Sequence, residues 1–205
     1  MNLQDFKVTV KSVYEGHHKI TYRGVKAIKC PFDYVIYQMI LVELKPDLVI
    51  EIGSNEGGGA LYIADLMNII GHGEIHTIDI VDNFDELVKS HPRIKSFTNG
   101  YEGYDLELTK AFQKILIIED ASHTYQDSIN CLNKFSETVS VGSYYIVEDG
   151  IIDKLGMKKL FSGGPKKAIK EFLANNRKFK IDKNWCNMFG KNATFNTDGY
   201  LKRIN

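Results

Sequence analysis

The feature that most constrains the fold is a series of short, almost uninterrupted apolar runs that recurs from about residue 46 onward. Four such runs span residues 48–53, 74–80, 114–120 and 143–149, and a weaker one spans residues 93–99. Runs of this length, rich in β-branched and aromatic residues, are typical of strands that are buried on both faces of a parallel sheet. They predict a parallel sheet at the centre of the fold.

Segments with helical spacing separate these runs, at residues 58–70, 124–138 and 166–175. Alternation of strands and helices predicts an α/β fold with a doubly wound, mostly parallel, Rossmann-like sheet. Near the end, residues 179–182 and 192–204 have strand-like patterns with no helical segment between them. We therefore expect an antiparallel C-terminal strand pair that closes one edge of the sheet.

The first 45 residues have a different pattern. Two short alternating segments flank a turn at Arg23-Gly24, and a helix is predicted from about Pro31 to Leu44, with Pro46 ending it. We expect residues 1–45 to be a cap segment over the sheet and its ligand, and residues 46–205 to be the single main domain. His17 and His18 look like a metal pair, but adjacent histidines in a strand point in opposite directions, so we assign them no role.

Composition excludes several classes of protein. Lys plus Arg and Asp plus Glu both number 26, so the chain lacks the basic excess of a nucleic-acid binder. It has no run of the ~20 apolar residues that a membrane span needs, and its N-terminus lacks the apolar core of a signal peptide. Three scattered cysteines, without a CxxC pair, are typical of a reduced protein. We therefore expect a cytoplasmic protein that binds neither nucleic acid nor membrane.

A glycine-rich turn, EIGSNEGGGA at residues 51–60, follows the first predicted strand. In an open α/β sheet the ligand crevice lies beyond the carboxyl ends of the strands, and glycines let the backbone approach a ligand there. The spacing matches neither a P-loop nor GxGxxG. A nicotinamide-dependent oxidoreductase is therefore a disfavoured alternative.

Two acidic residues indicate which ligand the turn could bind. Glu51, two residues before Gly53, could hold an ammonium group, and Asp79 at the end of the second strand could accept both hydroxyls of a ribose. S-adenosylmethionine carries both groups, with a sulfonium between them. The alternative is that the glycines only form a tight turn and that Asp79 is a helix cap or a solvated strand end.

Carboxylates also follow two later strands. Asp120 opens a D-x-x-H sequence with His123, and Glu148-Asp149 ends the next strand. Converging carboxylates repel one another unless a cation lies between them, and Mg²⁺ prefers such oxygen ligands. A metal lowers the pKa of a bound hydroxyl, and a histidine can then take its proton. Alternatively, the aspartates are helix N-caps and His123 is a surface residue.

Several ordered motifs give the chain a family resemblance. Residues 21–53 (TYRGVKAIKCPFDYVIYQMILVELKPDLVIEIG), GPKKAIKEFL at 164–173 and TFNTDGYLKR at 194–203 resemble the cephalosporin hydroxylase-like family, also called the rhamnosyl O-methyltransferase family. The resemblance implies a class I methyltransferase fold, S-adenosylmethionine and often Mg²⁺ as cofactors, and a sugar or antibiotic hydroxyl as acceptor. We therefore expect residues 46–205 to form a methyltransferase domain.

The resemblance also implies roles for individual residues. His123 would be the catalytic base, and the metal ligands would be Asp120, Glu148 and Asp149. Glu51 and Gly53 would lie in the cofactor turn and Asp79 on the ribose. The full set of residues that we expect to contact the cofactor is Glu51, Gly53, Ser54, Asn55, Gly57, Asp79, Tyr101 and Asp120. The chain departs from the family pattern at Asn55, where a second glycine is usual, at Gly100-Tyr101-Glu102, where Gly-Asp is usual, and at Ser122, where an acid is common.

The predicted activity is metal-assisted O-methylation of a sugar, glycan or glycosylated natural product. A non-catalytic S-adenosylmethionine-binding subunit of a complex remains an alternative, and we expect a homodimer or a higher homo-oligomer. Residues 151–164 are either a lid over the acceptor or an idle surface loop. Trp185 and Tyr101 fit either the core or an aromatic wall for a sugar.

Overall fold

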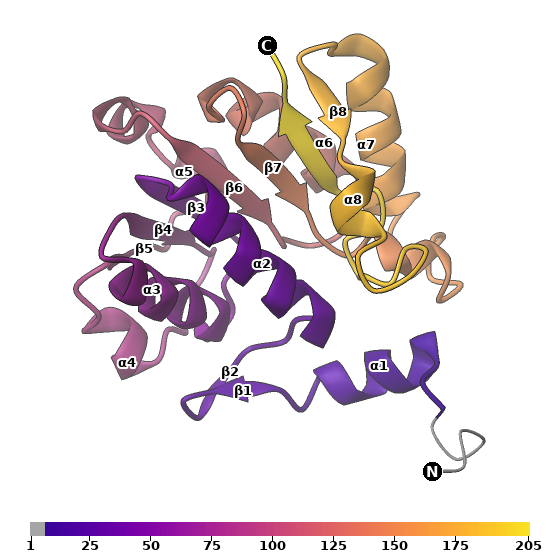
Figure 1. Cartoon of the computed structure of the whole chain (residues 1–205), viewed down its shortest axis with the longest axis horizontal. Coiled ribbons are helices and arrows are strands. Elements are labelled where there is room, and N and C mark those ends of the chain that lie inside the picture. Colours follow the sequence, from indigo (N-terminus) through magenta and orange to yellow (C-terminus); the bar gives the residue numbers. More distant parts are fainter. Residues whose placement is uncertain (1–6) are drawn as a thin grey trace.

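A seven-stranded sheet forms the centre of the computed structural model, which describes residues 7–205 (Figure 1). The strands lie in the order β5-β4-β3-β6-β7-β9-β8. Pairs from β5 to β7 are parallel, whereas β9 is antiparallel to β7 and to β8. The predicted α/β fold with a mostly parallel sheet is confirmed. The strand bounds are β3 Leu48–Ile52, β4 Glu74–Ile78, β5 Ile94–Phe97, β6 Ile115–Glu119, β7 Tyr144–Val147, β8 Phe179–Ile181 and β9 Tyr200–Arg203.

The C-terminal strand pair differs in detail from the expectation. The antiparallel strand β9 lies inside the sheet, between β7 and β8, so β8 is the outermost strand. A four-residue helix, α8 (Lys183–Cys186), lies between β8 and β9, where no helix was expected. The strand is also shorter than the segment 192–204, because residues before it bond to side chains instead of a neighbouring strand. Asp33 accepts hydrogen bonds from the Thr194 hydroxyl and, at 2.9 Å, from the Phe195 amide.

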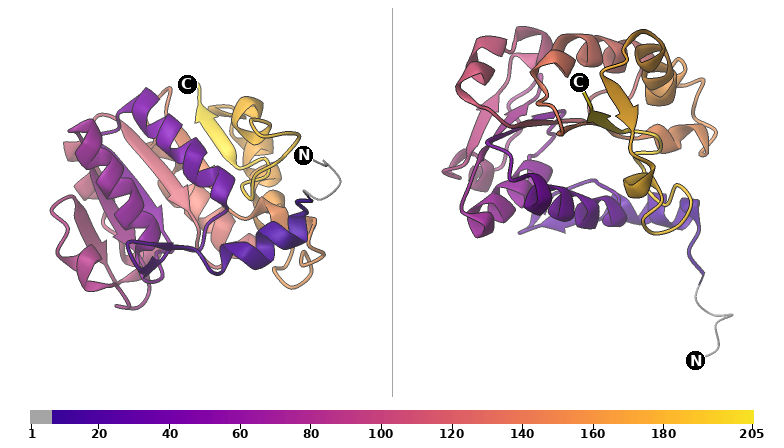
Figure 2. Two further views of the ribbon diagram at one scale, coloured as in Figure 1. Left: turned by 60° about the horizontal axis from the view of Figure 1, so that its bottom comes forward. Right: turned by 45° about the horizontal axis from the view of Figure 1, so that its top comes forward.

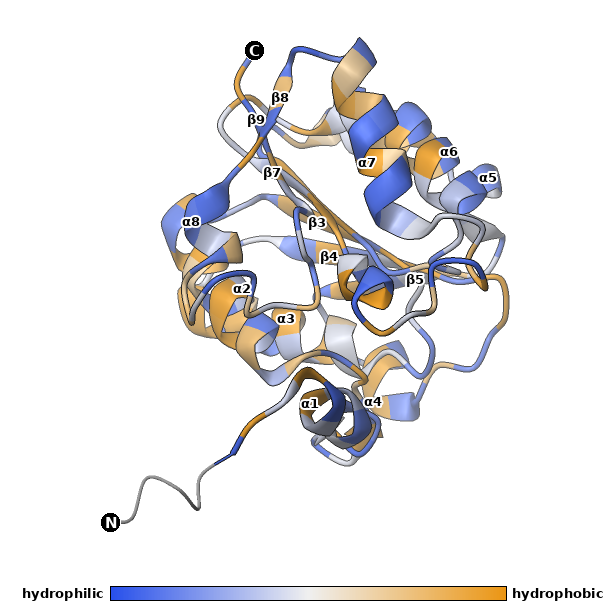
Figure 3. Ribbon diagram, turned by 90° about the vertical axis from the view of Figure 1, so that its right-hand side faces the viewer, coloured by the Kyte–Doolittle hydropathy of each residue, from blue (hydrophilic) through white to orange (hydrophobic). Residues whose placement is uncertain are grey.

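Helices cover both faces of the sheet (Figure 2). The helices α6 (Tyr125–Phe135) and α7 (Gly164–Asn175) pack on one face, and α2 (Pro31–Leu44) and α3 (Gly58–Ile70) pack on the other. Successive side chains of a strand point to opposite faces. Both faces are therefore apolar, and hydrophobic residues concentrate along the strands (Figure 3).

The N-terminal segment contributes to the same core. The helix α2 begins at Pro31, ends where Lys45 takes a left-handed conformation, and buries Ile36 and Ile40 against the sheet. Among residues 7–205 no helix is long and apolar enough to cross a bilayer. The remaining elements are α1 Val10–His17, β1 Thr21–Tyr22, β2 Val25–Lys26, α4 Glu86–Lys89, α5 Gly100–Gly103 and the 3-10 helices η2 Leu106–Ala111, η3 Ser136–Thr138 and η4 Gly150–Asp153.

Candidate active site

A cavity of about 720 Å³ lies beyond the carboxyl ends of β3, β4, β6 and β7. This is the edge of the sheet where the sequence predicts a ligand site. Nine of the predicted site residues line the cavity, whereas Gly57 and Glu148 do not. The nine are Glu51, Gly53, Ser54, Asn55, Asp79, Tyr101, Asp120, His123 and Asp149.

The glycine-rich turn joins two parts of the cavity wall. Gly53 has a φ of +88°, and a Cβ atom added there would lie 2.0 Å from the carbonyl oxygen of Asp120. Only glycine therefore allows the turn after β3 to contact the loop after β6. Gly57 also has a positive φ, but a Cβ there would meet the Val88 side chain at 2.8 Å. Gly57 thus permits close packing against α4 and lies away from the cavity wall.

Asp79 holds the glycine-rich turn in place. Its Oδ2 accepts hydrogen bonds from the amides of Ser54 (2.9 Å) and Asn55 (2.8 Å), and its Oδ1 accepts one from the Ile80 amide (2.7 Å). A carboxylate oxygen has two lone pairs, so Oδ1 keeps capacity for a ligand hydroxyl. Asp79 therefore stabilises the turn through these hydrogen bonds, and it also lies on the cavity wall where it could bind a ribose.

Glu51 already has an ammonium partner within the chain. Its Oε2 accepts a 2.8 Å hydrogen bond from the Thr77 hydroxyl, and its Oε1 lies 3.5 Å from the Nζ atom of Lys29. Sequence reasoning missed Lys29. The sequence holds no clear signal for it, because lysine is rarely buried unless it is paired and Lys26, three residues earlier, is exposed.

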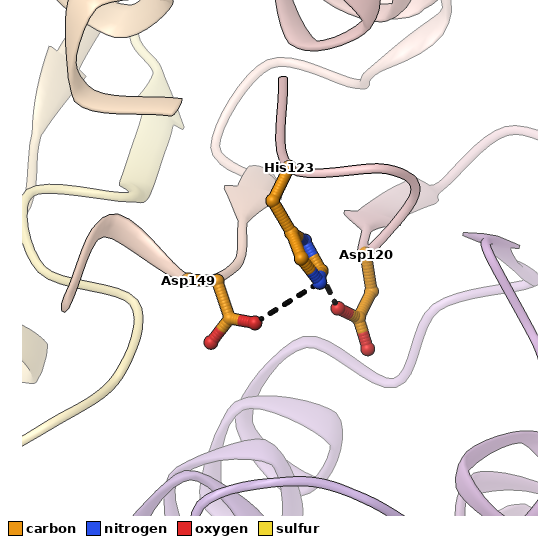
Figure 4. Close-up of side chains that lie close together, drawn as sticks. All are labelled: Asp120, His123 and Asp149. Carbon is orange, nitrogen blue, oxygen red and sulfur yellow. Dashed lines mark ion pairs between the residues drawn. The ribbon is translucent and has the colours of Figure 1, made fainter. Parts of the chain in front are cut away.

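Three of the predicted polar residues come together on the other side of the cavity (Figure 4). Potential ligand atoms of Asp120, His123 and Asp149 all lie within 4.8 Å of one another. The Nε2 atom of His123 is 3.2 Å from Asp149 Oδ2, and its Nδ1 atom is 3.8 Å from Asp120 Oδ1. Side chains with this mixture of oxygen and nitrogen atoms can bind a divalent cation.

Glu148 points to a different set of partners. Its Oε1 accepts hydrogen bonds from Lys29 Nζ and from the Tyr37 hydroxyl, both at 2.7 Å. Both residues follow β7, which ends at Val147, and Asp149 takes a left-handed conformation with a φ of +56°, so the backbone turns and the two side chains diverge. The geometry therefore groups Asp149 with His123 and Glu148 with Lys29, while Asp120 contacts both, with its Oδ2 2.9 Å from Lys29 Nζ.

The charges of this region perturb the pKa values of its members. Burial lowers the pKa of His123, but Asp149 and Asp120 raise it, and the net shift is upward. Burial raises the pKa of Asp149 to about 6 and that of Glu148 to about 7. Burial also lowers the pKa of Lys29, but Asp120, Glu148 and Glu51 raise it to well above its ordinary value. The carboxylates outnumber the cations, so an added cation would be stabilised here.

The expectation for His17 and His18 was wrong in its premise. His17 is the last residue of α1 and His18 is the C-cap, so the two are helical and not extended. Their ring centroids lie 4.0 Å apart, and both residues line the cavity, as does Tyr14. In a helix, successive side chains are rotated by about 100° around the axis and not by the roughly 180° of a strand. The alternating-strand argument therefore does not apply.

Other lining residues come from the segments that sequence reasoning left open. Ile152, Met157 and Phe161 of the segment 151–164 line the cavity, so this segment is part of its wall. Tyr101 also lines it, with its hydroxyl 3.2 Å from Asp127 Oδ1. Trp185 is buried in the core, as the first of its two interpretations predicts, and its Nε1 donates a 3.0 Å hydrogen bond to the Tyr144 hydroxyl.

Nearly the whole chain is similar in sequence to known proteins. The model of the family "Rhamnosyl O-methyltransferase/CmcI" matches residues 15–204. A rhamnosyl O-methyltransferase of Mycobacterium leprae is 29% identical over 223 residues, which cover 94% of this chain and 91% of that protein. A rhamnosyl O-methyltransferase of Mycobacterium tuberculosis is 30% identical over 164 residues, which cover 75% of this chain and 66% of that protein.

Solved structures share the fold. A structure of CmcI with Mg and SAM matches with a TM-score of 0.69 and 21% identity, covering 92% of this chain and 78% of that one. The O-methyltransferase TomG from Streptomyces achromogenes, in complex with SAM, matches with a TM-score of 0.57 and 13% identity, covering 97% of this chain and 92% of that one. Both similarities confirm the class I methyltransferase fold that the sequence resemblance implies.

Proposed function

The chain belongs to the rhamnosyl O-methyltransferase/CmcI family, and from this membership we propose that it transfers the methyl group of S-adenosylmethionine to a hydroxyl of a sugar, glycan or glycosylated natural product. We further propose that a divalent metal ion, such as Mg²⁺, assists the reaction. One observation carries the proposal: the turn after β3 and the acidic loop after β6 are in van der Waals contact at Gly53 and Asp120, within a single cavity. A methyl donor and an acceptor hydroxyl would therefore lie side by side.

The donor would bind along the glycine-rich turn. Asp79 would accept the ribose hydroxyls, as acidic residues at the end of the second strand do in related sheets. Ser54 and Asn55, whose amides bond to Asp79, would fix the turn beside the methionine part, and Tyr101 would contact the adenine from α5. The positions of these residues on the cavity wall support this assignment.

The residues after β6 and β7 fit a divalent cation. Asp120 and Asp149 would hold the ion, and the His123 imidazole, which has a nitrogen within 4.8 Å of their oxygens, would stay free of it to act on the acceptor. Of the three ligands predicted from the sequence, Asp120 and Asp149 lie together beside His123, whereas Glu148 Oε1 accepts hydrogen bonds from both Lys29 and Tyr37. Asp120 also bonds to Lys29, at 2.9 Å, but through Oδ2, so its Oδ1 is left for the ion. When bound, the ion would supply Lewis acidity that lowers the pKa of the acceptor hydroxyl.

His123 is the proposed general base. With its Nε2–H donated to Asp149 Oδ2, 3.2 Å away, its Nδ1 is left to accept the proton of the acceptor hydroxyl. The acceptor oxygen then forms a bond to the methyl carbon, and the bond from that carbon to sulfur breaks. The two aspartates stabilise the imidazolium that results. The rest of the catalysis is positioning of the two substrates.

The acceptor would occupy the part of the cavity between the N-terminal segment and the segment 151–164. Tyr14, His17 and Phe161 line the cavity, which supports the proposal that the N-terminal segment caps the main domain of residues 46–205. Of the proposed cap, residues 1–45, the first six lie outside the described residues. We also propose a cytoplasmic location, which the three buried free cysteines support. A homo-oligomer is proposed from the sequence alone.

The function is tested by methyl transfer from labelled S-adenosylmethionine to a panel of nucleotide sugars, glycans and glycosides, with Mg²⁺ or with a chelator. The proposal predicts transfer to at least one hydroxyl, and its loss in chelator. Isothermal titration with S-adenosylmethionine and with its demethylated product tests the donor site separately. Absence of binding to either compound would contradict the proposal.

A further inference from the structure

The ammonium group of Lys29 lies at the centre of a buried group of carboxylates. Its Nζ atom is 2.7 Å from Glu148 Oε1, 2.9 Å from Asp120 Oδ2 and 3.5 Å from Glu51 Oε1. The lysine side chain is 4% exposed. Glu51 lies in β3, and Asp120 and Glu148 directly follow β6 and β7, so one cation joins three neighbouring strands. Sequence reasoning assigns no role to this residue.

The surrounding chain is shaped to hold this lysine. Lys29 lies directly before the start of α2, where Cys30 is the N-cap and Pro31 begins the helix, so its backbone is fixed. A Cβ atom at Gly59 would lie 2.6 Å from both Lys29 Cε and Glu51 Oε1. Gly59, the second residue of α3, therefore leaves the space through which the lysine reaches Glu51. Because a buried charge is costly unless it is paired, this arrangement stabilises the lysine only together with its carboxylates.

Asp120 lies between two groups of side chains. Its Oδ2 bonds to Lys29, and its Oδ1 faces His123 at 3.8 Å. Glu51 and Glu148 lie on the lysine side, and Asp149 lies on the histidine side. The acidic region thus has a lysine subsite (Glu51, Glu148 and Asp120 Oδ2) and a histidine subsite (Asp120 Oδ1, His123 and Asp149).

We propose that Lys29 is a positioning residue that acts as a fixed internal cation. It occupies the lysine subsite, orients Asp120 and restricts the region to one divalent ion in the histidine subsite. The second half of this inference rests on the proposed metal-assisted function. Two-metal sites hold their ions about 3.5–4 Å apart, a spacing that a carboxylate with one oxygen in each subsite can bridge. Without the lysine, the same carboxylates would hold a second divalent ion.

The test replaces Lys29 with a neutral side chain of similar length and counts bound ions. Equilibrium dialysis and electron paramagnetic resonance with Mn²⁺ are applied to the wild type, to Lys29→Met and to a control, Lys89→Met, whose lysine pairs with Asp82 on the surface. We expect one ion per chain in the wild type and the control. We expect two ions in Lys29→Met, with the spectrum of a spin-coupled pair. A lysine of purely structural importance would not alter the number of ions.

The outcomes separate this inference from the proposed function. A folded Lys29→Met protein that binds one Mn²⁺ with wild-type affinity would overturn the role of Lys29 and leave the function intact. A wild type that binds no Mn²⁺ and transfers no methyl group would overturn the function itself. If Lys29→Met is unfolded without metal, we expect Mn²⁺ to refold it, with two ions bound. Failure of Mn²⁺ to refold it, while Lys29→Arg folds with one ion, would also overturn the inference.

Discussion

The two sides of the cavity are built in different ways. On the side of β3 and β4, the backbone amides of Ser54 and Asn55 bond to Asp79, so the turn is held by hydrogen bonds within itself. On the side of β6 and β7, Asp120, His123 and Asp149 meet through their side chains, and burial raises the pKa of Asp149 to about 6. The turn after β3 is therefore held in its conformation without a ligand, whereas the side of β6 and β7 has an excess of negative charge.

This difference indicates a division of work. A pre-formed backbone turn suits a donor that must be held in one position, because little order remains to be imposed on binding. A side-chain group with excess charge suits a cation and a proton transfer, because its members change their charge state easily. We therefore expect substitutions on the two sides to separate cofactor binding from metal binding and turnover.

The largest effect is expected for His123→Ala. Loss of the proposed base should lower turnover roughly 10²–10⁴-fold, with little change in the affinity for S-adenosylhomocysteine, because the donor side is untouched. Single-turnover rates and isothermal titration measure the two quantities. His72→Ala, which removes an exposed histidine paired with Asp47, is the control. A variant with unchanged turnover would remove His123 from the mechanism.

A substitution at the point of contact should disturb both sides together. Gly53→Ala introduces a Cβ 2.0 Å from the Asp120 carbonyl oxygen at a φ of +88°. Backbone strain alone costs roughly 1–3 kcal/mol, and the clash adds to it, so thermal stability and both ligand affinities should fall. Gly142→Ala is the matched control, because its φ is +86° and nothing lies within 4 Å of the added atom. Equal losses in the two variants would show that the contact is unimportant.

The two sides can be separated with one isosteric substitution on each. Asp79→Asn should weaken S-adenosylhomocysteine binding and leave Mn²⁺ binding unchanged, whereas Asp149→Asn should do the reverse. Each loss should be roughly 10- to 100-fold, since a hydrogen bond to a charged group contributes about 1.5–3 kcal/mol. Titration calorimetry of both variants with both ligands gives the four affinities. If each substitution weakened both ligands equally, the division between the sides would be wrong.

The smallest effect concerns the charge on His123 in metal-free protein. Burial lowers the pKa of His123, and Asp149 is the largest of the contributions that raise it above its ordinary value. Asp149→Asn should therefore lower this pKa, as measured by nuclear magnetic resonance titration of the imidazole. A raised histidine pKa stabilises the fold at low pH, and this contribution is lost as the pH rises through the folded-state pKa. As the pH rises through the folded-state pKa of His123, the free energy of unfolding should therefore fall less in Asp149→Asn than in the wild type.

The sequence predicted the sheet well because the information was local. Apolar runs such as residues 48–53 and 114–120 correspond to strands buried on both faces, and the turn glycines mark the ligand edge. The strand expected over residues 192–204 was shortened to Tyr200–Arg203 because Asp33, more than 150 residues earlier, binds its first part. Such a contact leaves no periodic signal in either segment.

The side chains after β6 and β7 were harder to predict, because their partners also lie far away in the sequence. The convergence of Asp120, His123 and Asp149 could be predicted, because the carboxyl ends of neighbouring parallel strands lie at the same edge of a sheet. That Glu148 turns to Lys29 and Tyr37 depends on side chains 111 to 119 residues away. The error at His17 and His18 arose because a short segment with an equivocal pattern forms a helix, stabilised by a capping box of Thr9 and Ser12.

The central claim is that a methyl donor and a metal ion lie side by side in one cavity. It is tested most directly by the effect of bound Mn²⁺ on the nuclear relaxation of the methyl protons of bound S-adenosylmethionine. At a Mn²⁺ concentration that just fills the wild-type site, the account predicts strong paramagnetic relaxation that Asp149→Asn removes and that Lys89→Met preserves. Bound Mn²⁺ with no effect on the methyl protons, or an effect that survives Asp149→Asn, would contradict it.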